Sequence, residues 1–226
     1  MSKARTEIFA RLKSVLDLKQ DRIVRTQNAE QRIRAATPNL IPARGRAEGL
    51  TRAIIFEEEA KFAQAEVRKL VNLKAVPDIV RDICQEAQTT ALKIAPHPEL
   101  QVLEWQGLNV EFGPGAGSDL VGLSRAYAGV AETGTLVMVS GPASPSTLNF
   151  LPDVHIVVIH TEDIVANYEQ VWSRLRQDAG GDTPVMPRTV NWITGPSRTA
   201  DIEQTLLLGA HGPRKLIILL IDAKNP

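Results

Sequence analysis

Apolar residues at intervals of three and four predict helices in the first half of the chain. In "SKARTEIFARLKSVLDLKQ" this spacing predicts a helix over about residues 3–20, which could continue through "DRIVRTQNAEQRIRAA" to Ala36. In "VPDIVRDICQEAQTTAL" it predicts an amphipathic helix that begins at Val76. Pro77 fits the first turn of that helix, and Asp78 is favourable at the positive end of its dipole.

The same spacing recurs in "TEDIVANYEQVWSRLRQ". It predicts a third helix over residues 161–177, with Thr161 as its N-cap and two acidic residues in the first turn. The apolar face of this helix would begin with Ile164 and Val165.

Short apolar runs between the helices predict strands. "VHIVVIH" (154–160) and "KLIILLI" (215–221) are continuous enough to be fully buried strands. "YAGVAETGTLVMVS" predicts a strand, a tight turn at residues 132–134 and a second strand. Weaker runs predict strands at residues 64–71, 92–96, 108–112 and 189–193. Because helices alternate with apolar strands, the predicted fold class is α/β, with an open, mostly parallel sheet covered by helices.

Two prolines and two glycines in "TPNLIPARGRAEGLT" interrupt the pattern after the first helix. They divide the chain into a basic N-terminal helical arm (1–36), a linker (37–51) and an α/β domain (52–226). Residues 1–52 hold 12 Lys/Arg and 5 Asp/Glu, a balance of +7, whereas residues 53–226 hold 14 and 21, a balance of −7. The arm could therefore dock on the body, on an acidic partner or on an anionic surface, or it could be a solvated helix.

Composition excludes several functional classes. The 226 residues have zero net charge and only 4% aromatics, without the interleaving of basic and aromatic residues that single-stranded nucleic acid binding favours. The first residues carry charge and no apolar core of a signal peptide, and the longest aliphatic run, "LIILLI" (216–221), is too short to span a bilayer. We therefore expect a cytoplasmic protein that binds neither nucleic acid nor membrane.

The chain contains one cysteine, Cys84. One thiol cannot form an intrachain disulfide or hold an iron–sulphur cluster, which needs about four thiolates. Cys84 lies next to an apolar stripe, so it is expected to pack in the core as an apolar residue rather than to act as a nucleophile. No cluster of His, Cys, Asp and Glu has the spacing of a metal site, so no metal is expected.

The stretch "TGPSRTADIEQTLLLGAHGP" (194–213) places polar residues, glycines and prolines between two predicted strands. Gly195 permits unusual backbone angles or close approach of a ligand, and Pro196 stiffens the turn. Ser197 or Thr199 could cap a helix formed by "ADIEQTLL". Such a helix start attracts anions, and ligands bind at the carboxyl ends of strands in parallel sheets. The stretch therefore predicts a small-anion pocket.

Arg198 could add a planar fork for a carboxylate or phosphate. The alternative is a plain capped helix, with Arg198 in solvent or paired with Asp201 or Glu203. His211 lies between two glycines and could transfer protons or bind a ligand, although a lone His is more often structural. A triad of Ser197, His211 and Asp201 can be written, but "GPSRT" lacks the second glycine of a nucleophile elbow.

A second candidate is the turn "AETGT" (131–135). Glu132 could act as a general base or nucleophile at the end of a strand, with the hydroxyls of Thr133 and Thr135 beside it. The alternative is an ordinary hairpin turn, in which Thr and Gly134 are expected for conformational reasons. "GPGAGS" (113–118) has neither the order of a dinucleotide-binding loop nor a Walker lysine.

The stretches "AETGTLVMVSGP", "LPDVHIVVI" and "TGPSRTADIEQTLLLGAHGPRKLIILLID" resemble the LUD-domain family, and within it the lactate utilisation protein C branch. The resemblance is strong over about residues 119–222 and loose over 27–75. It implies a fold like that of the ribose-phosphate isomerase and CoA-transferase group. It also implies a non-redox accessory subunit in bacterial oxidation of L-lactate to pyruvate, beside an iron–sulphur LUD protein and a cysteine-rich lactate-utilisation protein that would hold the clusters.

By the same resemblance, the family signature marks the candidate site residues. Glu132 and His211 are candidate proton carriers, and a small carboxylate is the expected ligand. The ligand-binding candidates are Thr133, Gly134, Thr135, Gly195, Pro196, Ser197, Arg198, Thr199, Asp201 and Gly212. Two other functions stay open: a stand-alone isomerase- or CoA-transferase-like enzyme that uses Glu132, and an assembly module without chemistry.

Overall fold

The fold is taken from a computed structural model of the chain. The structure describes residues 3–16, 22–179, 186–201, 205–209 and 211–222. It divides into two units, Met1–Leu40 and Ile41–Pro226, and each is considered by itself. None of the helices in these described ranges combines the length and the apolar character that a bilayer crossing needs.

The first unit contains two helices, α1 (Lys3–Leu16) and α2 (Arg22–Ala35), where one helix over 3–20 or a single helix to Ala36 was predicted. The apolar spacing of the predicted helix includes Ile8, Leu12 and Leu18, and Leu18 lies outside the described residues. On α1, Ile8 and Leu12 are exposed, so the described part of this stripe is not covered.

The second unit begins at Ile41, inside the predicted linker 37–51. A short 3₁₀ helix, η1 (Ala43–Arg46), packs against the body there, and the Asn167 Nδ2 atom donates a hydrogen bond to the Gly45 carbonyl at 2.7 Å. The division of the chain into arm, linker and domain stays a prediction, and the contact of Gly45 shows that part of the proposed linker is ordered against the body.

In the second unit, helices alternate with strands as far as β3, and α6 is the α-helix described among the later strands. The α-helices are α3 (Thr51–Phe62), α4 (Val76–Glu86), α5 (Pro98–Gln101) and α6 (Tyr168–Asp178). The strands are β1 (Glu66–Leu70), β2 (Ala91–Ile94), β3 (Asn109–Phe112), β4 (Val121–Arg125), β5 (Ala128–Val130), β6 (Thr135–Val139), β7 (Val154–His160), β8 (Ile164–Val165), β9 (Val190–Ile193), β10 (Arg198–Asp201), β11 (Thr205–Leu208) and β12 (Lys215–Ile221).

Six strands form the parallel sheet that the sequence predicts, in the order β1-β12-β7-β4-β2-β3. Four others form a mixed sheet in the order β8-β5-β6-β9, in which β6 pairs antiparallel with both neighbours. The predicted strand–turn–strand around residues 132–134 is confirmed as β5, the 3₁₀ turn η3 (Ala131–Thr133) and β6. The α/β class with a mostly parallel sheet is therefore confirmed.

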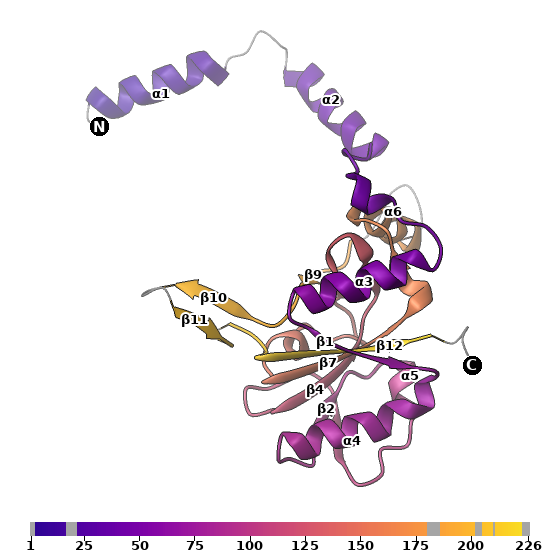
Figure 1. The fold of residues 1–226 in the computed structure, drawn as a ribbon. Helices are drawn as coiled ribbons and strands as arrows, with labels where there is room; N and C mark the ends of the chain where they lie inside the picture. The colour runs from indigo at the N-terminus through magenta and orange to yellow at the C-terminus, as the bar shows by residue number, and fades with distance from the viewer. Residues whose placement is uncertain (1–2, 17–21, 180–185, 202–204, 210, 223–226) are drawn as a thin grey trace. The chain divides into compact units, whose positions relative to one another are not determined.

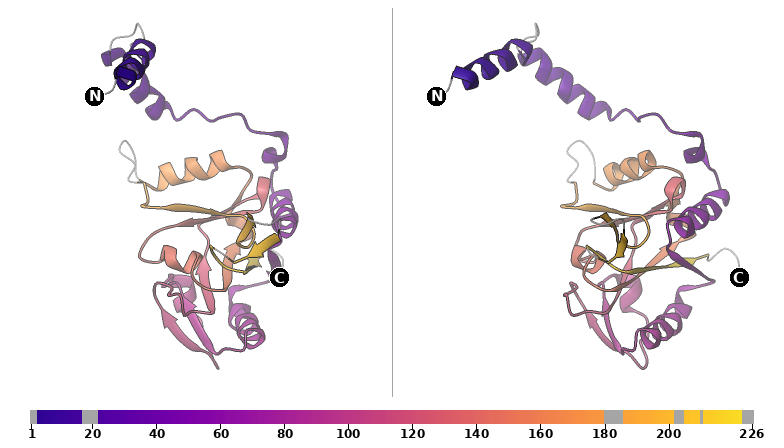
Figure 2. Two further views of the ribbon diagram at one scale, coloured as in Figure 1. Left: turned by 90° about the vertical axis from the view of Figure 1, so that its left-hand side faces the viewer. Right: turned by 60° about the vertical axis from the view of Figure 1, so that its left-hand side comes forward.

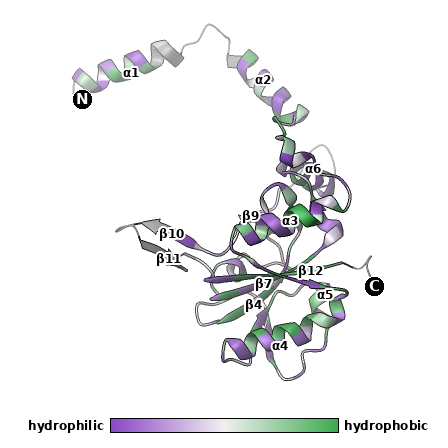
Figure 3. Ribbon diagram, viewed as in Figure 1, coloured by the Kyte–Doolittle hydropathy of each residue, from purple (hydrophilic) through white to green (hydrophobic). Residues whose placement is uncertain are grey.

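Helices cover both faces of the six-stranded sheet, and Figure 1 shows α3 on one side with α4 and α5 on the other. Alternate residues of β12 enter different cores: Ile217 packs with the α4 side, and Ile218 with the α3 side. Because both faces of β12 and β7 are buried, the sequences of these strands are continuously apolar. In contrast, α4 alternates between hydrophobic and hydrophilic bands, as expected for a helix with one face in water (Figure 3).

Cys84 is buried in the core beneath α4. Burial raises the pKa of its thiol to about 11, so the thiolate is scarcely populated near neutral pH. This agrees with the prediction that Cys84 packs in the core as an apolar residue.

The four-stranded sheet has its own apolar core against α6 (Figure 2). The ring of Trp192 on β9 lies 5.0 Å from that of Tyr168 and 5.3 Å from that of Trp172, measured between centroids. These aromatic contacts join β9 to α6, and β9 leads directly into residues 194–198.

The predicted third helix begins later than expected. Residues 161–163 form a 3₁₀ turn, Ile164 and Val165 form β8 beside β5, and α6 begins at Tyr168. The prediction of Thr161 as N-cap is wrong, because Asn167 accepts a hydrogen bond from the Gln170 amide at 3.1 Å and caps α6 instead. Two consecutive β-branched residues favour the strand pairing over the helix.

The predicted helix over "ADIEQTLL" is also wrong. The described residues there form an antiparallel hairpin, in which Arg198 pairs with Leu208 and Asp201 with Thr205. Backbone hydrogen bonds of Ser197 join the two strands where they begin and end. Its amide donates to the Pro213 carbonyl at 2.8 Å, and its carbonyl accepts from the Gly209 amide at 3.0 Å. These bonds hold the two arms side by side, so residues 197–201 provide no helix N-terminus for an anion.

Gly134 generates a stability prediction. Its φ is 62°, and an added Cβ would lie 2.1 Å from the Ala60 nitrogen on α3. We expect Gly134→Ala to destabilise the second unit by about 3 kcal/mol or more, because both the backbone angle and the clash oppose a side chain. Urea unfolding measures the change.

Substitutions at two other glycines distinguish the effect of the backbone angle from that of the clash with α3. Gly49 has a φ of 56° with nothing within 4 Å, so Gly49→Ala should cost about 1 kcal/mol from the backbone angle alone. Gly141 has neither constraint, so Gly141→Ala should be close to neutral. Equal stability of the Gly134→Ala and Gly49→Ala variants would contradict the close approach to α3.

Candidate functional site

A cavity of about 270 Å³ lies where residues 194–198 meet residues 211–213. Its lining comes from residues 192–198, residues 211–213, Asn149, Phe150, His155 and Leu216. The cavity therefore brings together six of the predicted site residues: Gly195, Pro196, Ser197, Arg198, His211 and Gly212. Its volume suits a ligand of a few heavy atoms.

The cavity lies at the amino ends of the central parallel strands. His155 is the second residue of β7, Leu216 is the second residue of β12, and the two are register partners. Residues 194–198 do follow the carboxyl end of β9, but β9 belongs to the four-stranded sheet. The expectation of a pocket at the carboxyl edge of the parallel sheet is therefore wrong for this cavity.

Close contact with the end of α3 positions the segment that carries Arg198. Gly195 has a φ of 71°, and an added Cβ would lie 2.0 Å from the Ala63 carbonyl oxygen. The Arg198 Nη2 atom donates to the same carbonyl at 3.3 Å. Arg198 thus contacts one of the free carbonyls at the helix end, and its guanidinium keeps further N–H donors. The side chains of Thr199 and Asp201, and all of Glu203, lie outside the described residues.

The other side of the loop pair carries His211 and Gly212. His211 is exposed beside the cavity. An added Cβ on Gly212 would lie 3.2 Å from the Ser197 Cβ atom, so residues 211–213 pass close to Ser197. Because the side chain of Asp201 is not described, the triad of Ser197, His211 and Asp201 stays untested.

Two buried polar residues of the cavity lining were not predicted from the sequence. His155 is fully buried and Asn149 is 3% exposed, and both line the cavity. The His155 Nε2 atom forms a 2.6 Å hydrogen bond with the Ser124 hydroxyl on β4. Burial lowers the pKa of His155 to about 3, so the ring is neutral near pH 7. A histidine inside "VHIVVIH" was the available signal, since a polar residue in a fully buried strand needs a partner.

Hydroxyl groups connect the cavity to the turn "AETGT". The Thr135 hydroxyl lies 2.7 Å from that of Thr194, which lines the cavity, and 2.7 Å from that of Thr133. The Tyr168 hydroxyl completes the group, at 2.8 Å from Thr133 and 3.0 Å from Thr135. Thr133 and Thr135 therefore belong to a hydrogen-bonded network behind the cavity rather than to its lining.

Glu132 does not line the cavity. Its side chain is largely buried, and its Oε1 atom lies 3.5 Å from the Arg44 Nε atom. An added Cβ on Gly45 would lie 3.0 Å from the Glu132 Oε2 atom, so η1 covers this carboxylate. Glu132 and His211 are therefore not brought together in one pocket.

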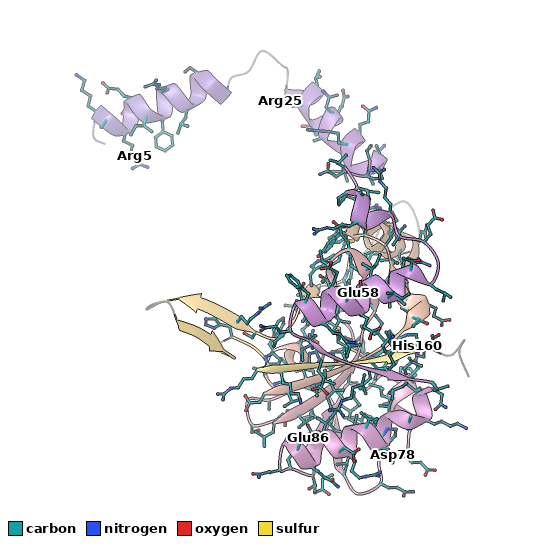
Figure 4. The ribbon with its side chains drawn as sticks, in the orientation of Figure 1. Arg5, Arg25, Glu58, Asp78, Glu86 and His160 are labelled. Atoms are coloured by element: carbon teal, nitrogen blue, oxygen red, sulfur yellow. The ribbon has the colours of Figure 1, made fainter. Side chains whose placement is uncertain are left out.

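A charged cluster that the sequence analysis missed occupies the carboxyl edge of the parallel sheet. Arg125 ends β4, its Nε atom lies 3.1 Å from Glu99, and its Nη2 atom is paired with Asp163. His160 ends β7, and its Nε2 atom lies 2.9 Å from Glu99. Arg174 of α6 also pairs with Asp163, at 3.0 Å. Figure 4 labels His160 at this end of the sheet.

Burial alone would raise the pKa of Glu99, but the hydrogen bond from His160 and the charge of Arg125 lower the pKa overall. These side chains thus pair with one another across five elements, namely α5, β4, β7, the 3₁₀ turn at residues 161–163 and α6. Such mutual pairing is typical of a structural network. Among the side chains that the structure describes, no group of three His, Cys, Asp or Glu could hold a metal ion.

Fold and site together define an α/β protein with a small polar cavity between two loops at the amino edge of its parallel sheet. The sequence profile of the LUD domain matches residues 55–221. The chain belongs to the LUD domain family.

Similar proteins place the chain within this family. An uncharacterised protein of Neisseria meningitidis is 42% identical over 100 residues, covering 44% of this chain and 41% of that protein. Lactate utilization protein C of Bacillus subtilis is 35% identical over 102 residues, covering 45% and 42%. That of Bacillus velezensis is 32% identical over 139 residues, covering 60% and 56%. The resemblance to the lactate utilisation protein C branch is thus confirmed, although the matches span about half the length of these relatives.

A solved structure supports the fold. The crystal structure of a DUF162 family protein from Deinococcus radiodurans matches with a TM-score of 0.54 and 18% identity, over 77% of this chain and 99% of that chain.

The burial of His155 generates a prediction about acid stability. Its pKa is about 3 in the folded chain and about 6.5 in an unfolded chain. The unfolded state therefore binds more protons between these values, and the free energy of unfolding falls as the pH falls through this window. At pH 5 the loss relative to pH 7 should be about 2 kcal/mol from this residue.

Urea unfolding of wild type and His155→Gln at pH 7 and pH 5 measures this contribution. The variant should lose about 2 kcal/mol less than wild type on acidification, because Gln does not titrate. An unchanged loss in His155→Gln would show that His155 is not buried and neutral.

Proposed function

We propose that this chain is a non-redox subunit of a bacterial system that oxidises L-lactate to pyruvate, and that its cavity binds a small carboxylate. The observation that carries the proposal is the convergence of residues 195–198 and 211–212 on one small cavity. The names of the relatives from Bacillus subtilis and Bacillus velezensis support a role in lactate utilisation.

Arg198 is the proposed carboxylate ligand. Among the side chains that the structure describes, no carboxylate lies within ion-pair distance of its guanidinium. One of its five donors is used on the Ala63 carbonyl, and the others can form a planar fork for a carboxylate. Because residues 198–201 form a strand, the proposed site uses this fork and no helix dipole.

His211 is the proposed proton carrier at the cavity. It is exposed there, whereas Glu132 lies under η1 and outside the lining. The redox step would belong to partners, because the single, buried Cys84 cannot supply the thiolates of an iron–sulphur cluster. We propose an iron–sulphur LUD protein and a cysteine-rich lactate-utilisation protein as these partners, with the chain acting in the cytoplasm.

The proposal predicts that Arg198→Ala weakens lactate oxidation. In a strain whose chromosomal copy is deleted, the variant should support L-lactate-dependent dye reduction at about one tenth of the wild-type rate or less, since a charge-assisted hydrogen bond contributes about 1.5–3 kcal/mol. Arg198→Lys should recover only part of the rate, because it keeps the charge and loses the fork.

Arg188→Ala is the matched control, because Arg188 is exposed and does not line the cavity. It should behave as wild type, and immunoblots should show equal amounts of all variants. Wild-type lactate oxidation by Arg198→Ala at equal abundance would overturn the proposed site.

A further inference from the structure

Among the described residues, Glu132 is a buried carboxylate with one loose ion pair. Its side chain is 10% exposed, and its Oε1 atom lies 3.5 Å from the Nε atom of Arg44, whose side chain is 64% exposed. An ion pair with an exposed partner contributes little, whereas a buried carboxylate usually has close partners. Glu57 has such partners: it is 14% exposed, and the Lys61 Nζ atom lies 2.7 Å from it. Pairing alone therefore does not explain why Glu132 is buried.

Residues 42–46, which contain η1, are what shields this carboxylate, and we call them the cover. Gly45 is buried in the cover, and an added Cβ on it would lie 3.0 Å from the Glu132 Oε2 atom. The Asn167 Nδ2 atom donates to the Gly45 carbonyl at 2.7 Å. In the described second unit, this hydrogen bond and the pair of Arg44 with Glu132 are the polar contacts that join the cover to the rest of the body.

The cover has few other contacts to hold it in place. Gly45 is the buried residue of the stretch 42–49, and no apolar side chain of this stretch is buried. Gly49, between the cover and α3, has a φ of 56°, and an added Cβ would meet nothing within 4 Å. Segments with few buried apolar contacts open locally while the core stays folded, and a glycine without packing partners absorbs the change of backbone angles.

We propose that the cover is an autoinhibitory strap that opens about Gly49 and exposes the Glu132 carboxylate, and that the hydrogen bond from Asn167 to Gly45 holds it closed. In the closed state the chain supplies its own backbone and its own cation, Arg44, to Glu132. Opening leaves a carboxylate, which can only accept hydrogen bonds, beside the amide of Asn167, which then has a free donor. The exposed site suits a ligand that presents a cationic or N–H group to Glu132 and a carbonyl to Asn167.

A permanent structural role is the alternative for the cover. A segment that serves only to complete the core normally inserts an apolar side chain, because apolar burial is what stabilises it. Here the inserted residue is a glycine, and the group beneath it is a carboxylate. The inference is independent of the proposed function, because Glu132 does not line the cavity that contains Arg198.

A reversible lock of the cover tests the inference on the full chain. An added Cβ on Gly45 would lie 3.2 Å from the Asn167 Cβ atom, so a small shift brings the pair Gly45→Cys and Asn167→Cys to the about 3.5–4.5 Å of a disulfide. The native Cys84 is buried. Accessible carboxylates are labelled with a water-soluble carbodiimide and glycine ethyl ester, and peptide mass spectrometry gives the rate for each residue.

Labelling of Glu132 should be about fivefold or more slower in the oxidised double variant than in the same protein after reduction, because the labelling rate follows the population of the open form. Glu57 is the internal control, since it is similarly buried on α3 and not under the cover. Its rate should be the same in both states, which also shows that the fold is unchanged.

Two single variants test the hydrogen bond itself. Asn167→Ser keeps a capping hydroxyl for α6 but cannot donate to Gly45, so Glu132 should be labelled about threefold or more faster than in wild type. Arg44→Ala is the matched control from the same contact, and it should change the rate by about twofold or less because Arg44 is exposed.

Equal labelling of Glu132 in the oxidised and reduced double variant would overturn the strap, and so would a wild-type Glu132 that stays unlabelled when Glu57 reacts. A wild-type rate in Asn167→Ser would overturn the role of the hydrogen bond. None of these results bears on lactate oxidation by Arg198→Ala, so the inference and the proposed function can fail separately.

Discussion

The arrangement of the site depends on backbone packing against the end of α3, where no side chain fits. Gly134 and Gly195 both adopt positive φ angles, and an added Cβ on either would lie about 2 Å from the backbone of α3, at 2.1 Å from Ala60 and 2.0 Å from Ala63. These two turns belong to different parts of the chain. Their common contact with one helix fixes the four-stranded sheet relative to the face of the parallel sheet that α3 covers. It also explains why glycines occur at both positions, without any direct role in binding.

This packing connects the two signature segments through hydroxyl groups. Thr135 follows Gly134 and Thr194 precedes Gly195, and their hydroxyls lie 2.7 Å apart where β6 begins and β9 ends. A polar link of this kind sets the register of the strands, because it is satisfied in only one alignment. The end of β9 then delivers residues 195–198 to the cavity in a fixed position. Glu132 lies on the far side of the same turn, where η1 covers it, so its place in the signature reflects packing of the turn as much as chemistry.

The sequence predicted the parallel sheet because burial on both faces leaves a simple signal, the apolar runs of β7 and β12. The helices predicted to begin at Thr161 and over "ADIEQTLL" were wrong because contacts with residues distant in the sequence favour strands there. Ile164 and Val165 have helical spacing with later residues, but β5 offers them a strand partner. Ser197 and Thr199 are typical capping residues, but Pro213 and Gly209 bind the Ser197 backbone, and residues 198–201 pair with residues 205–208 as antiparallel strands. For the site, the loop signature located one part of the lining. Asn149 and His155 were missed because neither belongs to a motif and only the fold brings them to the cavity.

The carboxyl edge of the parallel sheet explains why the cavity lies at the other end. Ligands of open α/β sheets usually bind beyond the carboxyl ends of the strands. Here Arg125 occupies that position, with its side chain 9% exposed and paired to Glu99 and Asp163. An arginine that is both buried and doubly paired is costly to displace, because removal of its partners would leave an uncompensated charge. The amino ends of β7 and β12 instead receive two loops that contain glycine and proline and leave space between them. The buried side chains of His155 and Asn149 at this end are uncharged near pH 7, so the cavity brings no further buried charge into the core.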